Sequence, residues 1–519
     1  MTRVTTSSRP SSPGALLKNK KVRRLLTTGL LLTLAVITAS AQRVACFHPS
    51  DRAGTRTVYA LPDIKTFDPQ TTYRQPVVLV SCSDVDFSTD DPVGFYNRIF
   101  NEPGYNEGRG LGCVADYFRD QSGGRLNLEF DIYGPVKIEL SAFTEKGINY
   151  GYKIQRAAVE KLCETETTDF SIYDWDGNGE VDQVIFIIAG YTGNQMSGYL
   201  WPSTGWFVGP AFPGGIPASV ASLSCELWQY DTSCGIGTII HEFLHCLGLP
   251  DIYPMAPANT YSTVDEWDIM DGGNYTNYGW CPPNLSAMEK MLLGWGSPVE
   301  LTGETTITDM KSLSDGGDTY IIRNPANPDE YYLLENRQQK GWDYGIPGKG
   351  LLIYHVDYDE EAWKNNNLNK SDTYYRYDLF HADGLTYRDW NPKNTSSDET
   401  KWADEGHLHS KYLSTSAYPY VNPETLVVNA SLTNESSPAA TLFTPNTDGQ
   451  LLMSKPVTNI QMSGDGTISF DFMKAPTAIQ WAQPEADHSP WYDLQGRRLH
   501  SRPAHKGLYI RNGKKEIVF

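Results

Sequence analysis

The stretch that most constrains this chain is residues 238–251, TIIHEFLHCLGLPD. On a helix, His241 and His245 lie one turn apart on the same face, so their two imidazoles can converge on one metal ion. Glu242 lies one residue further round, close enough to hold a metal-bound water and take its proton. The sequence therefore predicts a metal site on this helix, with Glu242 beside the metal as the general base.

The end of this helix supplies the next constraint. We predict the helix over residues 235–247, and Gly248 favours the left-handed turn that reverses the chain. The reversal can bring Asp251 back as a third ligand, leaving a fourth position open. Three protein ligands and an open position are typical of catalytic zinc, whereas structural zinc has four protein ligands. A bare HExxH also occurs by chance in buried helices, but five positions are specified together here.

A second signature follows in residues 267–273, WDIMDGG, which resembles the methionine turn beneath the zinc in metzincin peptidases. Met270 would shape the floor below the metal without coordinating it. Asp251 stands where metzincins usually have a third His, and a carboxylate oxygen is an acceptable zinc ligand. Tyr275 and Tyr278 follow shortly after and are positional candidates for stabilising an oxyanion.

With these motifs the chain resembles the immune inhibitor A-like family of secreted bacterial zinc metallopeptidases. The similarity runs from about residue 74 to about residue 440, and its matching segments are residues 113–124, 241–253, 267–273, 288–295, 334–337 and 350–357. The resemblance implies a secreted zinc-dependent endopeptidase that hydrolyses peptide bonds of extracellular or host proteins. It also implies Asp251 as the third zinc ligand.

An acidic motif, DWDGNGEVD, occupies residues 174–182 and matches the first nine positions of a calcium loop. The candidate calcium ligands are Asp174, Asp176, Asn178, Glu180 and Asp182. The twelfth position, where an EF-hand has its bidentate Glu, is Ile185, so the motif is not an EF-hand. Residues 181–189 are instead predicted as a buried strand. We expect structural calcium, and the alternative is an acidic turn stabilised by side-chain bonds to the backbone.

The first 41 residues are predicted to be an export signal. They carry seven Lys or Arg and no acid, with an apolar run over residues 25–37 and then Ala39-Ser40-Ala41. The run is too short to span a bilayer comfortably, so no transmembrane segment is expected in the mature protein. Without these residues 36 basic and 62 acidic side chains remain, a net charge of 36 − 62 = −26. This acidity argues against nucleic acid or anionic membrane as a partner.

The eight cysteines permit disulfides if the destination is oxidising. Cys225 and Cys234 are the closest-spaced plausible pair, although connectivity does not follow from sequence. Cys246, which follows a predicted zinc ligand, is expected to pack in the core.

The last 29 residues differ from the acidic body of the chain. Residues 491–519 carry seven Lys or Arg against Asp493 and Glu516, and Asn512-Gly513 predicts a hairpin turn. This segment resembles the C-terminal sorting domain of the type IX secretion system in Bacteroidota. The resemblance implies outer-membrane secretion machinery as a partner and a protein that is secreted or held at the cell surface. The alternative is an edge hairpin that closes the preceding β domain.

The predicted fold class is α+β, with a metzincin-like domain of a twisted sheet, backing and active helices, then a β-rich accessory region and a small C-terminal β domain. Strands are expected at residues 76–81, 319–323, 331–335 and 350–357, and a helix at residues 154–164. Trp363 and the Asn-rich residues 365–369 are interpreted as a solvated polar loop, and the alternative is a contact with substrate or metal. The predicted parts are residues 1–41 (signal), 42–73 (short N-terminal or pro-segment), 74–298 (catalytic domain), 299–475 (β-rich region) and 476–519 (sorting segment).

Two other classes of function compete with the peptidase. One is a surface adhesin or glycan-binding protein that uses a metallopeptidase-like fold, and the other is an inactive calcium-stabilised module. The HExxH motif at His241 is intact, which disfavours both.

Overall fold

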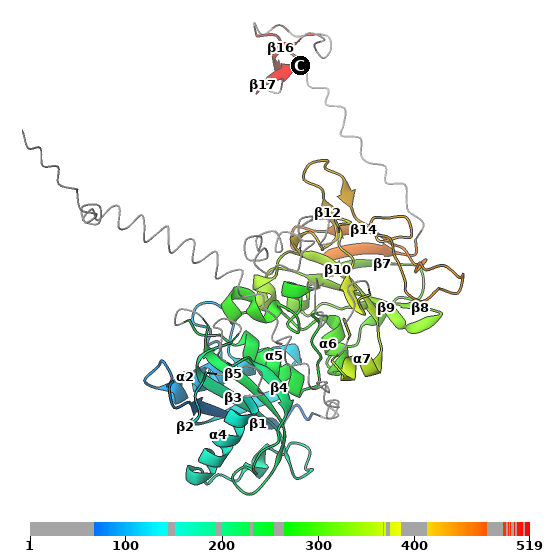
Figure 1. Ribbon diagram of the computed structural model, residues 1–519. Coiled ribbons are helices and arrows are strands. Elements are labelled where there is room, and N and C mark those ends of the chain that lie inside the picture. The colour runs from blue at the N-terminus through cyan, green and yellow to red at the C-terminus, as the bar shows by residue number, and fades with distance from the viewer. Residues whose placement is uncertain are drawn as a thin grey trace, which may run out of the picture. The chain divides into compact units, whose positions relative to one another are not determined.

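The structure is a computed structural model that describes most of the chain after residue 66. The described residues are 67–143, 151–193, 200–228, 232–253, 264–366, 368–369, 374–385, 413–474, 491–494, 497, 499, 503, 506–511 and 514–518. The predicted export signal, most of the segment 42–73 and the predicted turn Asn512-Gly513 lie outside them. The chain divides into two compact units, Met1–Met473 and Lys474–Phe519 (Figure 1). No helix within the described ranges is long and apolar enough to cross a membrane.

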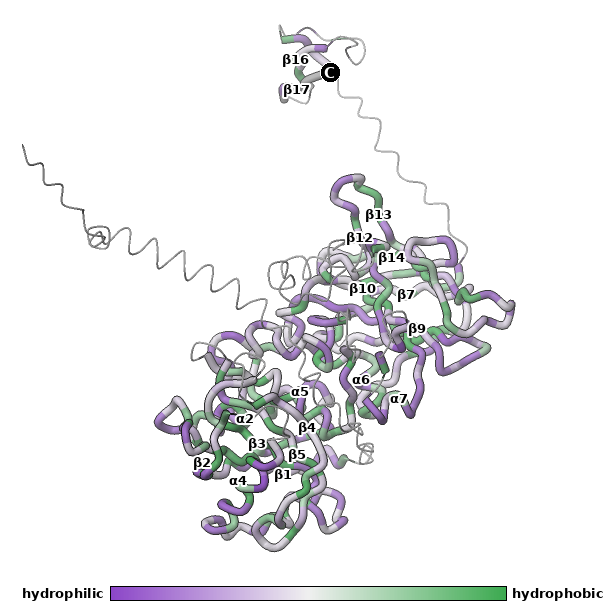
Figure 2. Tube along the Cα trace, viewed as in Figure 1, coloured by the Kyte–Doolittle hydropathy of each residue, from purple (hydrophilic) through white to green (hydrophobic). Residues whose placement is uncertain are grey.

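The first sheet of the larger unit has five strands in the order β2-β1-β3-β5-β4. All neighbours are parallel except β4 and β5, which are antiparallel. The three central strands are buried along most of their length, since both of their faces are covered, and β3 is the most apolar of them (Figure 2). The predicted strands at residues 76–81 and 181–189 are confirmed, each within a longer strand. The strands are β1 (Thr72–Ser81), β2 (Asn127–Lys137), β3 (Val181–Tyr191), β4 (Ser203–Trp206) and β5 (Ala218–Leu227).

Helices cover both faces of this sheet because alternate strand residues point to opposite sides. On one face, α4 (Gly151–Thr165) packs Ile154 and Ala158 against strand residues such as Phe186, which confirms the predicted helix. On the other face, Ile185 and Ile187 share a core with three helices (Figure 1). These are α2 (Pro92–Asn101), α3 (Val114–Gln121) and α5 (Gly237–Cys246).

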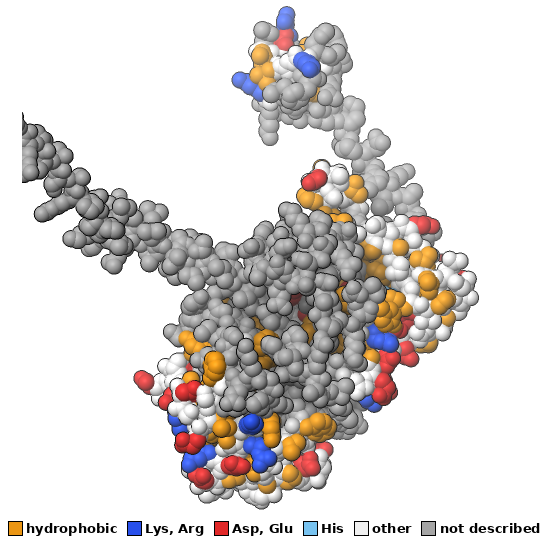
Figure 3. All heavy atoms as spheres, in the orientation of Figure 1, with side chains coloured by type: hydrophobic (Ala, Val, Ile, Leu, Met, Phe, Trp, Pro, Cys, Tyr) orange, Lys and Arg blue, Asp and Glu red, His pale blue; other side chains and the backbone are white. Residues whose placement is uncertain are grey.

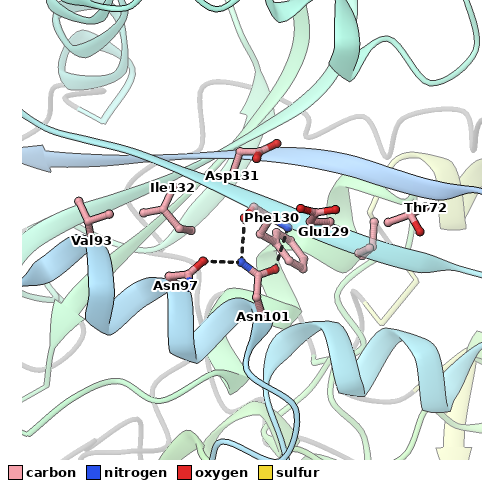
Figure 4. Close-up of a pocket in the computed structure, with 9 residues that line it drawn as sticks. Thr72, Val93, Asn97, Asn101, Glu129, Phe130, Asp131 and Ile132 are labelled. Atoms are coloured by element: carbon pink, nitrogen blue, oxygen red, sulfur yellow. Dashed lines mark hydrogen bonds between the residues drawn. The ribbon is translucent and has the colours of Figure 1, made fainter.

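The outer strand β2 is an edge, and Asn101 at the end of α2 covers part of it (Figure 4). The Asn101 Nδ2 donates to the carbonyl of Phe130 at 2.8 Å, and the Asn101 Oδ1 accepts from the Phe130 N–H at 2.8 Å. An amide that occupies both backbone groups of an edge residue blocks pairing with another strand there. A cavity of about 540 Å³ lies beside this contact, lined by residues of α2 such as Asn97 and Asn101 and residues of β2 such as Phe130 and Asp131.

The β-rich region contains a five-stranded sheet in the order β11-β10-β9-β8-β6 and a three-stranded sheet in the order β14-β15-β7. The strands predicted at residues 319–323, 331–335 and 350–357 are confirmed as β8, β9 and β10. The bounds are β6 (Val299–Glu300), β7 (Thr305–Met310), β8 (Tyr320–Asn324), β9 (Asn327–Arg337), β10 (Gly350–Asp357), β11 (Tyr377–Leu379), β12 (Tyr420–Val421), β13 (Val428–Asn429), β14 (Val457–Met462) and β15 (Ile468–Phe472).

Short helices lie between the longer elements in both parts of the larger unit and carry several of the sequence motifs. The 3₁₀ turns are η3 (Phe170–Tyr173), η4 (Asp265–Trp267), η5 (Gly273–Gly279), η6 (Leu313–Asp315) and η7 (Gly341–Gly345). The α-helices are α6 (Ala287–Leu292) and α7 (Glu360–Lys364). The mixed α+β class with few helices and several sheets is confirmed.

One hydrophobic core continues across the predicted domain boundary after residue 298. It contains Phe243 of α5 together with Trp342 and Leu352 of the β-rich region. The Trp342 ring lies edge-on to Tyr117 at 5.0 Å, and the Trp342 Nε1 donates to the Asp120 carboxylate at 3.0 Å. The two predicted segments therefore share one apolar interior.

The smaller unit contains the predicted C-terminal hairpin, formed by β16 (Gly507–Arg511) and β17 (Lys514–Val518). Tyr492 makes an antiparallel bridge to Ile510. The hairpin is confirmed, and its role in sorting stays a prediction.

The structure does not join Cys225 to Cys234, so the suggested disulfide is wrong for this structure. Cys225 packs in the core beneath α4, whereas Cys234 packs with Trp228 and Tyr275. Successive side chains around the end of β5 point to different sides, which separates the two sulfurs despite their closeness in sequence. Cys246 is a buried core thiol, as predicted.

A buried arginine connects the segment before residue 298 to the β-rich region. Arg337 is fully buried, and its Nη1 donates to Glu335 at 2.8 Å. The Arg337 Nε and Nη2 donate to the two carboxylate oxygens of Asp343 at 2.9 and 2.6 Å. Glu335 in turn accepts from the N–H of Ala287, the first residue of α6, at 2.8 Å. Arg337 thus balances two carboxylates that have no access to water.

We expect Arg337→Ala to lower the free energy of unfolding by about 3–5 kcal/mol, because Glu335 and Asp343 would remain buried without their cation. The matched control is Lys340→Ala, which removes a half-exposed ion pair with Asp315 and should cost at most about 1 kcal/mol. Urea unfolding of both variants measures the difference. Equal losses in the two variants would contradict a structural role for the buried pair.

Candidate metal centre

Helix α5 carries the HExxH motif and is buried along its whole length. It runs from Gly237 to Cys246, slightly shorter than the predicted residues 235–247, because Gly235 takes a left-handed φ of +70° before it. Gly248 ends the helix with a φ of +100°, as predicted, and the Leu249 N–H returns to the Leu244 carbonyl at 3.1 Å. The chain therefore reverses directly after His245.

This reversal brings together the three predicted metal ligands. His241 Nε2 lies 3.3 Å from Asp251 Oδ1, and His245 Nε2 lies 3.1 Å from the same oxygen. One ligand atom from each residue lies within 4.8 Å of the others, and all three side chains are buried. Burial alone would raise the pKa of Asp251, whereas protonated His245 and His241 lower it well below its usual range. A cation held between neutral imidazoles would take over that role and keep Asp251 ionised.

Backbone carbonyls orient both imidazoles. His241 Nδ1 lies 2.7 Å from the Ile269 carbonyl, and His245 Nδ1 lies 2.7 Å from the Leu249 carbonyl. A carbonyl only accepts, so each Nδ1 carries the proton and each Nε2 presents a lone pair. Two lone pairs and a carboxylate oxygen then converge with no proton among them. A cation satisfies such a set of acceptors, so the residues fit a zinc ion.

Glu242 is buried beside this cluster and is held by a residue that the sequence did not reveal. The Thr204 hydroxyl, on β4, lies 2.8 Å from Glu242 Oε2 and 2.7 Å from the Glu242 backbone carbonyl. The other carboxylate oxygen, Oε1, is buried and has no hydrogen-bond partner among the described residues. Thr204 therefore fixes one oxygen of Glu242 and leaves the other available.

The interpretation of Trp363 and residues 365–369 as a solvated loop is wrong for three of these residues, because Trp363, Asn366 and Asn369 are buried. Asn366 Oδ1 accepts from the N–H of Asp251 at 2.6 Å, and Asn366 Nδ2 donates to Asp251 Oδ2 at 2.6 Å. Asn369 Nδ2 donates to the carbonyl of Ile252 at 2.8 Å. The density of asparagines was the only signal in the sequence, and it reads equally well as a polar loop.

The predicted methionine turn, residues 267–273, packs directly behind Asp251, the predicted third ligand. Met270 is fully buried in the main core, and its carbonyl accepts from the N–H of Ile252 at 2.9 Å. The Met270 N–H donates to Asp268 Oδ1 at 2.9 Å. This turn also supplies the Ile269 carbonyl that orients His241. It therefore shapes the site through its backbone as well as through Met270.

The two candidate oxyanion tyrosines lie in different surroundings. The Tyr275 ring packs against Trp228 with ring centres 5.3 Å apart. The Tyr278 side chain is 53% exposed and lies under the Arg109 guanidinium at 5.1 Å. These contacts assign no catalytic role to either hydroxyl, and the oxyanion role stays a prediction.

Below the methionine turn, Asp268 meets a second buried carboxyl, Glu289 of α6. Glu289 accepts from the Ser286 N–H at 2.6 Å and so completes the capping box of α6. Burial, together with the adjacent Asp268, raises the pKa of Glu289 well above its usual range. Burial also raises the pKa of Asp268. The pair therefore holds a proton on Glu289.

The acidic motif forms the loop before β3. Asp174, Asp176 and Asp182 each place a carboxylate oxygen within 4.8 Å of the other two. Burial, assisted by the charges of Asp176 and Asp174, raises the pKa of Asp182 to about 6. The loop also shows the alternative feature, since Asp174 Oδ1 accepts from the Gly177 N–H at 2.8 Å. The geometry is thus compatible with both predicted interpretations.

The other two candidate calcium ligands point elsewhere. Glu180 Oε2 accepts from the Ser219 hydroxyl at 2.5 Å. Asn178 directs its Nδ2 toward Asp176 at 3.1 Å, and its Oδ1 accepts from the Glu180 N–H at 2.8 Å. The cluster therefore consists of three aspartates.

Residues 223–293 match the family model of the immune inhibitor A peptidase M6, catalytic domain. The matched segment contains α5, Asp251, the methionine turn and Glu289. The match indicates a metallopeptidase, that is, a hydrolase, and it gives the adhesin alternative no support. No curated protein shows significant similarity to this chain.

The variant Glu289→Gln tests whether native Glu289 keeps its proton beside Asp268. Above about pH 4.5 the unfolded glutamate loses its proton while native Glu289 keeps it, so stability should fall with rising pH until the native carboxyl ionises. One proton corresponds to about 1.4 kcal/mol per pH unit. Glutamine can still donate to Asp268 and accept from Ser286, so the variant should lose this component of the slope. Urea unfolding between about pH 5 and pH 9 measures it.

The control for this experiment is Glu304→Gln, on an exposed side chain. Its stability should follow the wild-type pH dependence. A Glu289→Gln profile parallel to that of the wild type would mean that the pair carries no native proton.

Proposed function

We propose that the protein is a secreted zinc-dependent endopeptidase that hydrolyses peptide bonds of extracellular or host proteins. The observation that carries the proposal is the convergence of His241 Nε2, His245 Nε2 and Asp251 Oδ1, with Glu242 directly beside them. The match of residues 223–293 to a metallopeptidase catalytic domain supports the same chemistry. Protein or peptide chains are the substrates that this chemistry requires.

In this proposal His241, His245 and Asp251 hold the zinc ion. When bound, zinc supplies Lewis acidity, which acidifies water and polarises a scissile carbonyl. Glu242 accepts the proton of the attacking water and later delivers it to the leaving amine. Thr204 restrains Oε2 of Glu242, so Oε1 is the oxygen that exchanges the proton. Met270 forms the floor of the site, and Tyr275 or Tyr278 remains the candidate for the oxyanion.

We further propose that the protein is exported and is released or held outside the outer membrane. The composition of residues 1–41 and the basic C-terminal hairpin, β16–β17, support this location. The resemblance of residues 491–519 to a type IX sorting domain would make the outer-membrane secretion machinery a partner and Bacteroidota the source. On the described part of the face shown in Figure 3, acidic and basic side chains are interspersed.

Glu242→Ala tests the proposed mechanism. The variant should keep roughly one zinc per chain, because Glu242 is no ligand, while losing nearly all peptidase activity for want of a proton acceptor. His245→Ala and Asp251→Ala should instead lose zinc itself, because each removes one of three ligands. Metal analysis beside a casein assay measures both effects.

These variants distinguish the proposed general base from the proposed metal ligands. Wild-type activity in Glu242→Ala would contradict the role of Glu242 as the general base. Full zinc retention in Asp251→Ala would place the third ligand elsewhere.

We also propose that the loop of Asp174, Asp176 and Asp182 binds a structural calcium ion. Three carboxylates within 4.8 Å repel one another, and the raised pKa of Asp182 reflects that repulsion together with burial. Oxygen ligands of this kind suit a calcium ion, which would offset the repulsion.

Calcium should therefore raise the melting temperature of the protein by mass action at neutral pH. The effect should weaken below about pH 6, where Asp182 takes up a proton. The double change Asp174→Ala with Asp176→Ala should abolish the response. The charge-matched control Asp318→Ala with Asp329→Ala, on exposed side chains, should retain it. If calcium still raises the melting temperature of the Asp174→Ala, Asp176→Ala variant, the loop is an acidic turn and no calcium site.

A further inference from the structure

We propose that Asn366, in the β-rich region, is a positioning residue that fixes which oxygen of Asp251 meets the metal. This inference rests on the zinc site proposed above. Asn366 lies 115 residues after Asp251 in the sequence and is buried against it. It would act through Asp251 and touch neither the metal nor the substrate.

The contact between the two residues is reciprocal. The Asn366 amide donates through Nδ2 to Asp251 Oδ2 and accepts through Oδ1 from the Asp251 N–H, both at 2.6 Å. Two bonds to one residue fix both the backbone and the side-chain torsions of Asp251. The carboxylate therefore cannot rotate without breaking the bond to its outer oxygen.

The two oxygens of Asp251 have separate roles in this arrangement. Oδ1 lies 3.1 Å from His245 Nε2 and 3.3 Å from His241 Nε2, so it faces the cluster. Oδ2 faces away and accepts from Asn366. The clamp thus selects coordination through Oδ1 alone.

The chain holds Asn366 in place from both sides. Before it, α7 begins at the Asp359 cap, whose carboxylate accepts from the Ala362 N–H at 3.0 Å, and Trp363 packs against Tyr358 at 5.2 Å. Asn366 itself has a φ of +50°, in the left-handed region that asparagine tolerates better than most residues.

After Asn366, the next fixed point is Asn369. Its Nδ2 donates to the carbonyls of Ile252 and Tyr377, at 2.8 and 3.1 Å. Ile252 follows Asp251, and Tyr377 begins β11, so this contact holds the ligand segment against the β-rich sheet. The position of Asn366 is therefore set by the β-rich region.

The main test is Asn366→Gly, which keeps the left-handed backbone accessible while removing both bonds to Asp251. Loss of a residue that orients a metal ligand costs about 10- to 100-fold in metal affinity, so we expect a loss of that size. Competition with a chelator measures zinc affinity on the full-length protein. Absorption spectra of the cobalt-substituted protein should also change, because the released Oδ2 alters the coordination of Asp251.

Two further variants keep the test decisive. Asn366→Ser retains a small polar side chain that is too short to span both contacts, and it should also weaken zinc binding. The matched control is Asn365→Gly, the preceding residue, whose Nδ2 donates only within its own helix turn to Glu361, at 2.7 Å to the carbonyl. This control should destabilise α7 locally and leave zinc affinity within about twofold of wild type.

The outcomes separate this inference from the function on which it rests. If the wild type neither retains zinc nor cleaves casein, the proposed function fails. If the wild type does both, and folded Asn366→Gly and Asn366→Ser hold zinc within about twofold with unchanged cobalt spectra, the positioning role is overturned. A lower melting temperature of the zinc-free variants, without a loss of affinity, would likewise make Asn366 a purely structural contact.

Discussion

Placing three hydrogen-bond acceptor atoms together in the protein core is energetically unfavourable, and the surrounding structure is organised around this constraint. His241 Nε2, His245 Nε2 and Asp251 Oδ1 meet with no proton of their own to share, and such a set is unfavourable without a cation. The surrounding backbone is arranged to hold it nonetheless. Carbonyls from the helix reversal and the methionine turn fix the imidazole tautomers, and an amide fixes the carboxylate. The glycine that ends α5 and the turn that carries Met270 serve this one convergence.

A second set of buried charges lies beneath the first and ties it to the β-rich region. Asp268 caps the turn that carries Met270 and faces Glu289 of α6. The N-terminus of α6 is held by Glu335, which Arg337 pairs with. A buried ion pair adds little net stability, but removing one member is costly, so such a network holds its elements in one relative arrangement. The turn that carries Met270 is therefore fixed in part by residues of β9.

Much of the site could be predicted from the sequence because most of its candidate residues lie within a few residues of one another along the chain. The helical repeat places His241 over His245, and Gly248 turns the chain back to Asp251 within three residues. Strands such as β3 and β10 follow from runs of apolar residues. Thr204 and Asn366 could not be found this way, because they reach the site from 38 and 115 residues away. A single Thr on a short edge strand and an Asn in a polar loop have no periodicity that marks them.

Local patterns divide the sequence into a predicted catalytic part and an accessory part. Contacts between residues that are distant in sequence join the two parts in the folded chain. Alternating strands and polar turns mark a change of composition after residue 298, yet the core beneath α5 includes Trp342 and Leu352. A peptidase domain complete in itself would have its ligands oriented by its own residues. Here Asp251, the proposed third ligand, is bonded to Asn366, and the predicted methionine turn rests on a network that ends in β9. The β-rich region would therefore be part of the scaffold of the proposed metal site.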